Sequence, residues 1–130
     1  MLTIDPLLSF VKYIKKCYFV YMFRTTSQKK KMCTNCPIAK ASDLVGDSVV
    51  LIIVRELLGG SKRFGELHES LGGVSTRTLT EKLKKLEENK LVLRVEFKQK
   101  PPHVEYSLTV KGKGLKKIVS ALFDYGKNYL

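Results

Sequence analysis

The sequence predicts a mainly α-helical domain that carries a small β-hairpin, and three observations support this fold class. Apolar residues recur at helical spacing in several stretches between residues 37 and 89. Glycine pairs at 59–60 and 72–73 separate these stretches, as glycine commonly ends helices. After residue 90 the pattern changes to two alternating runs around a Pro-Pro pair, which predicts a hairpin, and one more helical stretch follows.

Length and charge limit the possible organisation and partners. The 130 residues are enough for one domain with a buried core and too few for two. The chain holds 24 Lys and Arg against 12 Asp and Glu, a net charge of +12. Such an excess favours a polyanionic partner, with nucleic acid ahead of an anionic membrane surface. Because residues 1–32 hold seven cations and one anion, they carry half of this excess.

We therefore divide the chain into a basic extension, residues 1–32, and a folded domain, residues 33–130. The extension contains an amphipathic stretch at 7–21, with three lysines opposite its apolar face. Three interpretations stay open: a packing or dimerisation helix, a helix on a membrane surface, or a segment upstream of a true start at Met22 or Met32. A membrane span is rejected because each lysine would cost roughly 2.5–3.5 kcal/mol at the bilayer centre. A secretory signal is rejected because no small-residue cleavage site follows.

The folded domain is expected to begin with two helices. Pro37 suits the first position of a helix that Gly46 ends. Asp47 or Ser48 can cap the second helix, 49–58, whose Val, Leu and Ile residues indicate burial on most sides.

A short helix at 64–71 and a longer one, capped by Ser75 and running to about residue 89, are expected next. The longer helix should bury Val74, Leu79, Leu83 and Leu86. At about 100° per residue, the outward face then holds Arg77, Glu81, Lys84 and Glu88.

Strands are predicted at 91–97 and 104–108, with Pro101-Pro102 in the hairpin tip between them. The last helix is expected to span residues 112–129. Its apolar face consists of Leu115, Ile118, Val119, Leu122 and Tyr125.

Two short helices joined by a glycine-containing turn and followed by a hairpin are the order of a winged helix-turn-helix. A helix about 10–12 Å wide fits the major groove of double-stranded DNA, where its first residues meet base edges. Hydroxyl groups there can bind phosphates, and an arginine can bind guanine through two hydrogen bonds. The predicted DNA contacts are Ser75, Thr76, Arg77, Thr80 and Lys84 on the long helix, Lys62 and Arg63 before the short one, and Lys98 and Lys100 at the hairpin tip.

Several segments resemble one family. The stretch from Arg55 to Leu67, RELLGGSKRFGEL, is similar to HxlR-type regulators, a branch close to MarR. The segments GVS at 73–75, LTEKL at 79–83 and VEYSLT at 104–109 are similar as well. The resemblance covers about residues 36–127. It implies a cytoplasmic homodimer whose first and last helices pack across a two-fold axis, and whose two recognition helices bind a pseudo-palindromic operator. It also implies a response to electrophiles or oxidants.

The sequence departs from this family at three places. Asp47-Ser48-Val49 stands where the family usually has Gly-Lys-Trp, Tyr125 where it has a late Trp, and Ser61 where it has Pro. The missing lysine removes one expected contact to the DNA backbone, whereas the aromatic changes concern packing.

Three cysteines without a secretory signal indicate the reducing cytoplasm. Cys36 precedes Pro37 at a predicted helix N-terminus, where the helix dipole and Lys40 favour a thiolate. Cys33 could resolve a sulfenate formed at Cys36. A Cys-Pro pair at this position is the redox-sensing site in several members of the family that the chain resembles. The alternative is a partly buried, inert thiol.

Neither a cofactor, a metal site nor a catalytic site is predicted. One Cys-x-x-Cys supplies two zinc ligands, and neither His68 nor His103 is spaced to complete them, unless four thiolates meet at a dimer axis. No phosphate-binding loop or nucleophile-base pair is evident. The leading hypothesis is a sequence-specific transcriptional regulator that responds to thiol oxidation at Cys36. The alternatives are a protein-interaction adaptor and a peripheral membrane regulator that uses residues 7–23.

Overall fold

The computed structural model describes residues 36–130 of a chain that divides into two units, 1–44 and 45–130. Helix α3 (Pro37–Val45) begins at the predicted proline. The predicted amphipathic stretch at 7–21 and Cys33 lie outside the described residues. The predicted division at residue 32 stays a prediction.

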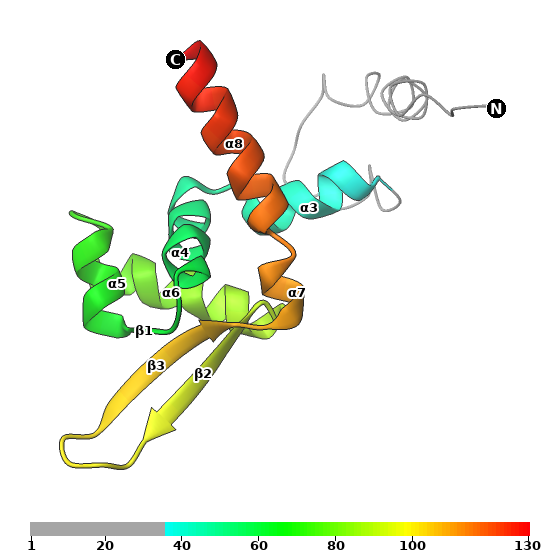
Figure 1. Cartoon of the computed structure of the whole chain (residues 1–130). Helices are drawn as coiled ribbons and strands as arrows, with labels where there is room; N and C mark the ends of the chain where they lie inside the picture. Colours follow the sequence, from blue (N-terminus) through cyan, green and yellow to red (C-terminus); the bar gives the residue numbers. More distant parts are fainter. Residues whose placement is uncertain (1–35) are drawn as a thin grey trace. The chain divides into compact units, whose positions relative to one another are not determined.

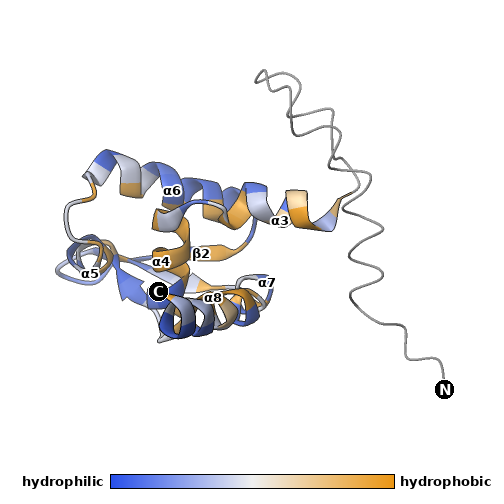
Figure 2. Ribbon diagram, turned by 90° about the horizontal axis from the view of Figure 1, so that it is seen from above, coloured by the Kyte–Doolittle hydropathy of each residue, from blue (hydrophilic) through white to orange (hydrophobic). Residues whose placement is uncertain are grey.

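Helix α4 (Ser48–Leu58) forms the centre of the second unit (Figure 1). Of the two predicted caps, the structure uses Asp47, whose Oδ1 accepts hydrogen bonds from the amides of Val49 (2.9 Å) and Val50 (3.4 Å). Figure 2 shows that α4 is largely hydrophobic, whereas α6 has a hydrophilic outer face. The core consists mainly of Val50, Ile53, Val54 and Leu57 from α4, Leu67 from α5, and Leu79, Leu83 and Leu86 from α6.

The helix-turn-helix consists of α5 (Phe64–Ser70) and α6 (Thr76–Glu88). Between them, Gly72 and Gly73 adopt φ angles of 31° and 95°, which other residues rarely adopt. Ser75 caps α6 as predicted, because its Oγ accepts the amide of Thr78 at 3.1 Å. Val74 is only half-buried, because it lies in the turn before the helix.

The predicted hairpin is part of a three-stranded antiparallel sheet in the order β1-β3-β2 (Figure 1). Strands β2 (Val92–Phe97) and β3 (His103–Leu108) form the wing. The sequence did not predict β1 (Lys62–Arg63), because two residues are too few to show an alternating pattern. Arg63 pairs with Glu105, so β1 joins the start of α5 directly to the wing.

The single helix predicted at 112–129 is wrong at its start, because the structure has α7 (Val110–Lys113) and α8 (Lys116–Tyr129). Thr109 begins α7: its Oγ1 accepts the Gly112 amide at 3.1 Å and donates to the Lys90 carbonyl at 2.6 Å. A Cβ at Gly112 would lie 2.1 Å from the Leu91 carbonyl oxygen, so this junction requires glycine.

Helix α8 has no buried residue, although its sequence predicts an apolar face. Leu115, Ile118 and Val119 are half-buried, while Leu122 and Tyr125 are exposed. None of the helices in residues 36–130 is long and apolar enough to cross a membrane.

Candidate nucleic-acid interface

The outer face of α6 carries the predicted contact residues, and the structure exposes them. Thr76, Arg77, Thr80 and Lys84 are all exposed, and 88% of the Arg77 side chain is accessible. The buried stripe explains this arrangement, because Leu79, Leu83 and Leu86 hold the opposite side of the helix in the core. That the four exposed residues contact DNA stays a prediction.

The hydroxyl groups of this face differ in what they can offer. Ser75 Oγ donates to Thr78 Oγ1 at 2.9 Å, and Thr80 Oγ1 donates to the Thr76 carbonyl at 2.7 Å. Both protons are therefore already engaged in holding the first turns of α6. The Thr76 hydroxyl makes no hydrogen bond within the part of the chain that is described, so it is the best placed of the three to donate to a phosphate.

Arg77 lies over its own helix in an exposed ion pair. Its Nε is 3.1 Å from Glu81 Oε1, one turn further along. Exposed pairs at this spacing contribute only about 0.3–0.5 kcal/mol, whereas a bidentate contact to guanine discriminates by about 1–3 kcal/mol. The ion pair with Glu81 is therefore weak enough for the Arg77 guanidinium to leave it and turn to a base.

The two cations before α5 are in different surroundings. Lys62 is half-buried near Glu56. The pKa of Glu56 is lowered, chiefly by its hydrogen bond with Arg55 (Nη2–Oε1, 2.7 Å) and in smaller part by the charges of Arg55 and Lys62. Lys62 is thus already in a favourable interaction with a carboxylate, while Arg63 is exposed.

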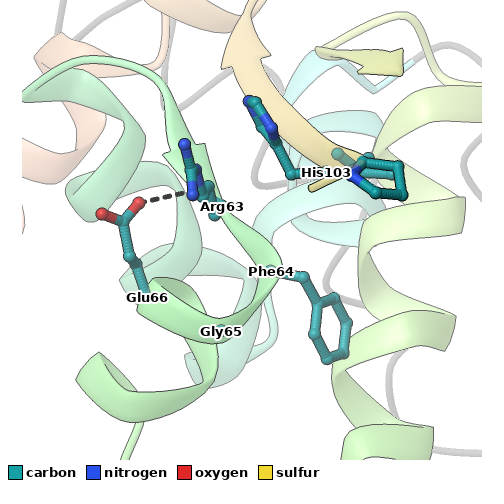
Figure 3. Close-up of a pocket in the computed structure, with 7 residues that line it drawn as sticks. Arg63, Phe64, Gly65, Glu66 and His103 are labelled. Atoms are coloured by element: carbon teal, nitrogen blue, oxygen red, sulfur yellow. Dashed lines mark hydrogen bonds between the residues drawn. The ribbon is translucent and has the colours of Figure 1, made fainter. Parts of the chain in front are cut away.

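A shallow hollow of about 450 Å³ separates the start of α5 from the wing (Figure 3). Arg63, Phe64 and Glu66 line one side, and His103 lies on the other. The backbone amide of Arg63 donates to Glu66 Oε2 at 2.7 Å, which fixes the first turn of α5.

A stacked pair of aromatic rings lies next to the lysine-bearing tip of the wing. Phe97 and His103 stack with ring centroids 4.8 Å apart, and His103 Nε2 is 3.2 Å from Glu105 Oε1. Beyond this stack, Lys98 and Lys100 are both exposed in the loop between β2 and β3. The structure therefore places these two predicted residues at the end of the wing, as the sequence suggested.

Lys82 is not among the residues that the sequence analysis singled out. Lys82 Nζ lies 2.6 Å from Asp47 Oδ2, so it connects α6 to the N-terminus of α4. A signal was available, because Lys82 follows Leu79 by three residues and therefore flanks the buried stripe.

Cys36 lies directly before α3, and its carbonyl accepts the Lys40 amide at 3.1 Å. Its side chain is buried, with 9% of the residue exposed. The geometry of a helix start is as predicted, while the burial limits access of reagents to the thiol. Within residues 36–130, no three His, Cys, Asp or Glu side chains are arranged to hold a metal ion.

An exposed, partly basic helix after a tight turn, flanked by a lysine-tipped wing, defines a transcriptional regulator of the helix-turn-helix type. The family model described as HxlR-like helix-turn-helix matches residues 44–130, and the chain belongs to this family.

The relatives share this description. An HTH-type transcriptional regulator of Synechocystis is 37% identical over 95 residues, which cover 73% of this chain and 70% of that protein. YdeP of Bacillus subtilis, another HTH-type transcriptional regulator, is 35% identical over 72% of this chain and 73% of its own length. These relatives are named as regulators, not enzymes.

Solved structures show the same fold. A MarR-family protein of Porphyromonas gingivalis matches with a TM-score of 0.72 and 29% identity, over 75% of this chain and 95% of that one. The redox regulator HypR in its oxidized form matches with a TM-score of 0.70 and 34% identity, over 73% and 98% of the two chains. The reduced form of YodB from B. subtilis has a TM-score of 0.64 and 32% identity, over 72% and 93%.

Proposed function

We propose that this protein binds double-stranded operator DNA as a homodimer and thereby controls transcription. The observation that carries the proposal is the exposed face of α6, with Thr76, Arg77 and Lys84, on the same unit as a wing that ends in two lysines. In this arrangement α6 enters the major groove and Arg77 contacts a guanine edge. Lys84 and the wing lysines contact phosphates, which gives affinity and register.

The dimer is supported by the apolar face of α8. Leu115, Ile118, Leu122, Tyr125 and Tyr129 follow one another at alternating spacings of three and four residues, the pattern of a helix that packs along another helix. The face is extended by Phe123, which is 68% exposed and lines a hollow of about 390 Å³ beside Leu58 of α4. Soluble monomers rarely leave a large apolar patch uncovered, and a second copy of the same helix would cover it.

A two-fold dimer sets the form of the DNA site. Two copies of α6 related by a two-fold axis require a pseudo-palindromic operator, with half-sites about one helical turn of DNA apart or a multiple of it. The operator should therefore lose most of its affinity when one half-site is scrambled.

We further propose that oxidants act on the protein through Cys36, with Cys33 as the resolving thiol. The position of Cys36 at the start of α3 supports this, and HypR is described in both oxidized and reduced forms. Because Cys36 is buried, we expect its oxidation to be slow unless the segment around it opens. Diamide should change operator binding of the wild type and leave the Cys36→Ser variant unchanged, as measured by fluorescence anisotropy.

The test of DNA recognition is a titration of the protein into labelled DNA from upstream of its own gene, with scrambled DNA as the control. At several salt concentrations, we expect tighter binding to the native sequence. The logarithm of affinity should fall with the logarithm of salt, with a slope of about −0.9 per phosphate neutralised. Equal affinity for both sequences would contradict the proposal and leave only a basic surface. Salt-insensitive, weak binding would favour the protein-interaction adaptor instead.

A further inference from the structure

Lys82 differs from the other lysines of α6 in the direction it takes. It is half-buried, with 29% of its side chain exposed, and it lies on the flank of the helix that turns toward α4. Lys84, two residues on, is exposed on the outer face. The two lysines therefore have the same charge and different surroundings.

The partner of Lys82 is a carboxylate with two roles. Asp47 Oδ2 is 2.6 Å from Lys82 Nζ, while Asp47 Oδ1 accepts the amides of Val49 and Val50 at the start of α4. One side chain therefore ties the first turn of the central helix to the middle of α6. The two residues are 35 positions apart, and their contact joins two helices.

The negative charge of Asp47 lies next to the positive charge of Lys82. The hydrogen bond from Lys82 is the largest effect and lowers the pKa of Asp47. Partial burial raises this pKa, and the hydrogen bond, together with the amides of Val50 and Val49 and the charge of Lys82, outweighs it. The carboxylate is therefore ionised at neutral pH, and its negative charge offsets that of the lysine. A lysine held in this way adds little to the attraction of phosphates.

We propose that Lys82 is a positioning residue: through Asp47 it sets the orientation of α6 on α4, and so the fit of Arg77 to its base, without contacting DNA. The inference rests on the proposed function, because it assigns a role within DNA recognition. It predicts that the pair affects discrimination between DNA sequences more than it affects binding to DNA in general. Arg77 is five residues along the same helix, so a small rotation of α6 displaces its guanidinium from the base edge.

Asp47→Asn tests the pair with little effect on the cap, since asparagine is an equally good N-cap and keeps a side-chain oxygen for the α4 amides. The variant removes one negative charge from a DNA-binding protein. Electrostatics alone therefore predicts tighter binding to every DNA. The inference predicts the opposite for the operator: the ratio of native to scrambled affinity falls roughly five-fold or more.

Lys82→Gln should lower the same ratio by a similar factor, and the Asp47→Asn/Lys82→Gln double variant should lose little more than either single one, because both remove one contact. Lys82→Arg, which can keep the ion pair, should restore most of the ratio. The matched comparison is Lys84→Gln, which should flatten the salt dependence by about 0.9 while Lys82→Gln leaves it unchanged. Lys127→Gln, at the far end of α8, controls for the loss of one charge.

Three results would overturn the inference. A flatter salt dependence in Lys82→Gln, with Asp47→Asn binding the operator as well as or better than the wild type, would show that Lys82 contacts a phosphate. A lower Tm in both variants with an unchanged affinity ratio, measured well below the transition, would show a pair that only stabilises the fold. If the wild type itself does not prefer the native DNA, the proposed function fails first, and the inference fails with it.

Discussion

Helices α6 and α8 both carry an apolar stripe, and the two stripes end in different environments. In α6, Leu79, Leu83 and Leu86 are completely buried in the core. In α8 no residue is buried, and Leu122 and Tyr125 are exposed. The α6 stripe stabilises the single chain, whereas the exposed part of the α8 stripe can contribute only when something else covers it.

We therefore assign different roles to the two stripes. Under the proposed function, the buried stripe of α6 leaves the other face of the helix to bind DNA, so folding and DNA binding use opposite sides of one helix. We propose that a second copy of the chain covers the exposed stripe of α8. Substitutions in the two stripes should therefore separate stability from oligomeric state.

The largest effect is expected in the α6 stripe. Leu83→Ala should lower the free energy of unfolding by about 2–5 kcal/mol, because it leaves a cavity in the core. Urea denaturation followed by circular dichroism measures the loss. A loss below about 1 kcal/mol would mean that α6 is loosely packed, and the contrast with α8 would disappear.

Leu122→Asp should instead abolish the dimer while leaving the secondary structure of the protein intact. The substitution places a charge in the apolar face of α8. The charge costs little while this face is exposed to water, but it is unfavourable when the face is buried in an interface. Sedimentation velocity should show a monomer, and operator affinity should fall because two half-sites are no longer bound together. Asn128→Asp, which also adds a negative charge to α8, should stay dimeric; a dimeric Leu122→Asp would contradict the assignment.

Two glycines should differ in how much their replacement by alanine changes the stability of the protein. Gly112→Ala should destabilise the protein by about 1–3 kcal/mol, because its Cβ would clash with the Leu91 carbonyl oxygen. Gly65→Ala in α5 should be neutral or stabilising by up to about 1 kcal/mol, because no atom lies within 4 Å of the added carbon and alanine favours helix. Thermal unfolding at equal protein concentration compares the two, and equal losses would be evidence against the close approach at Gly112.

The smallest effect is the pH dependence of stability that the pair between Asp47 and Lys82 of α6 should produce. In the folded protein the pKa of Asp47 is lowered from its ordinary value of 3.8 by the hydrogen bond from Lys82. The ionised Asp47 therefore contributes its full stabilisation of the fold when the pH is above 3.8. This contribution is lost as the pH falls from 3.8 toward the lower pKa of the folded protein. Between pH 5 and pH 2.5, stability should fall less steeply in Asp47→Asn than in the wild type. Identical curves would show that the pair contributes nothing.

Local signals in the sequence were sufficient for most of the fold. Asp47 and Ser75 act through hydrogen bonds to near neighbours, and Pro37 and the glycine pairs act through their own backbone conformation, so helix starts and ends were predictable. The start of α7 was not, because it depends on the hydrogen bond of Thr109 to the carbonyl of Lys90, which lies 19 positions earlier in the chain.

In the candidate site, too, some features follow from local sequence signals and others depend on how the chain packs. The exposure of Arg77 and Lys84 follows from helical periodicity, and the Arg77–Glu81 pair follows from a spacing of four residues. The position of Lys82 beside the buried stripe is a local signal too, but its pairing with Asp47 depends on how two helices pack. Strand β1 was missed for the same reason, because only its pairing with β3 makes it a strand.

The most direct test of the central claim is the affinity of Arg77→Ala for the operator and for scrambled DNA, measured by fluorescence anisotropy at one salt concentration. If α6 is the recognition helix, the variant should lose about 5- to 150-fold in affinity for the operator, equivalent to about 1–3 kcal/mol, and much less for scrambled DNA. An unchanged operator affinity, or an equal loss on both DNAs, would contradict the account.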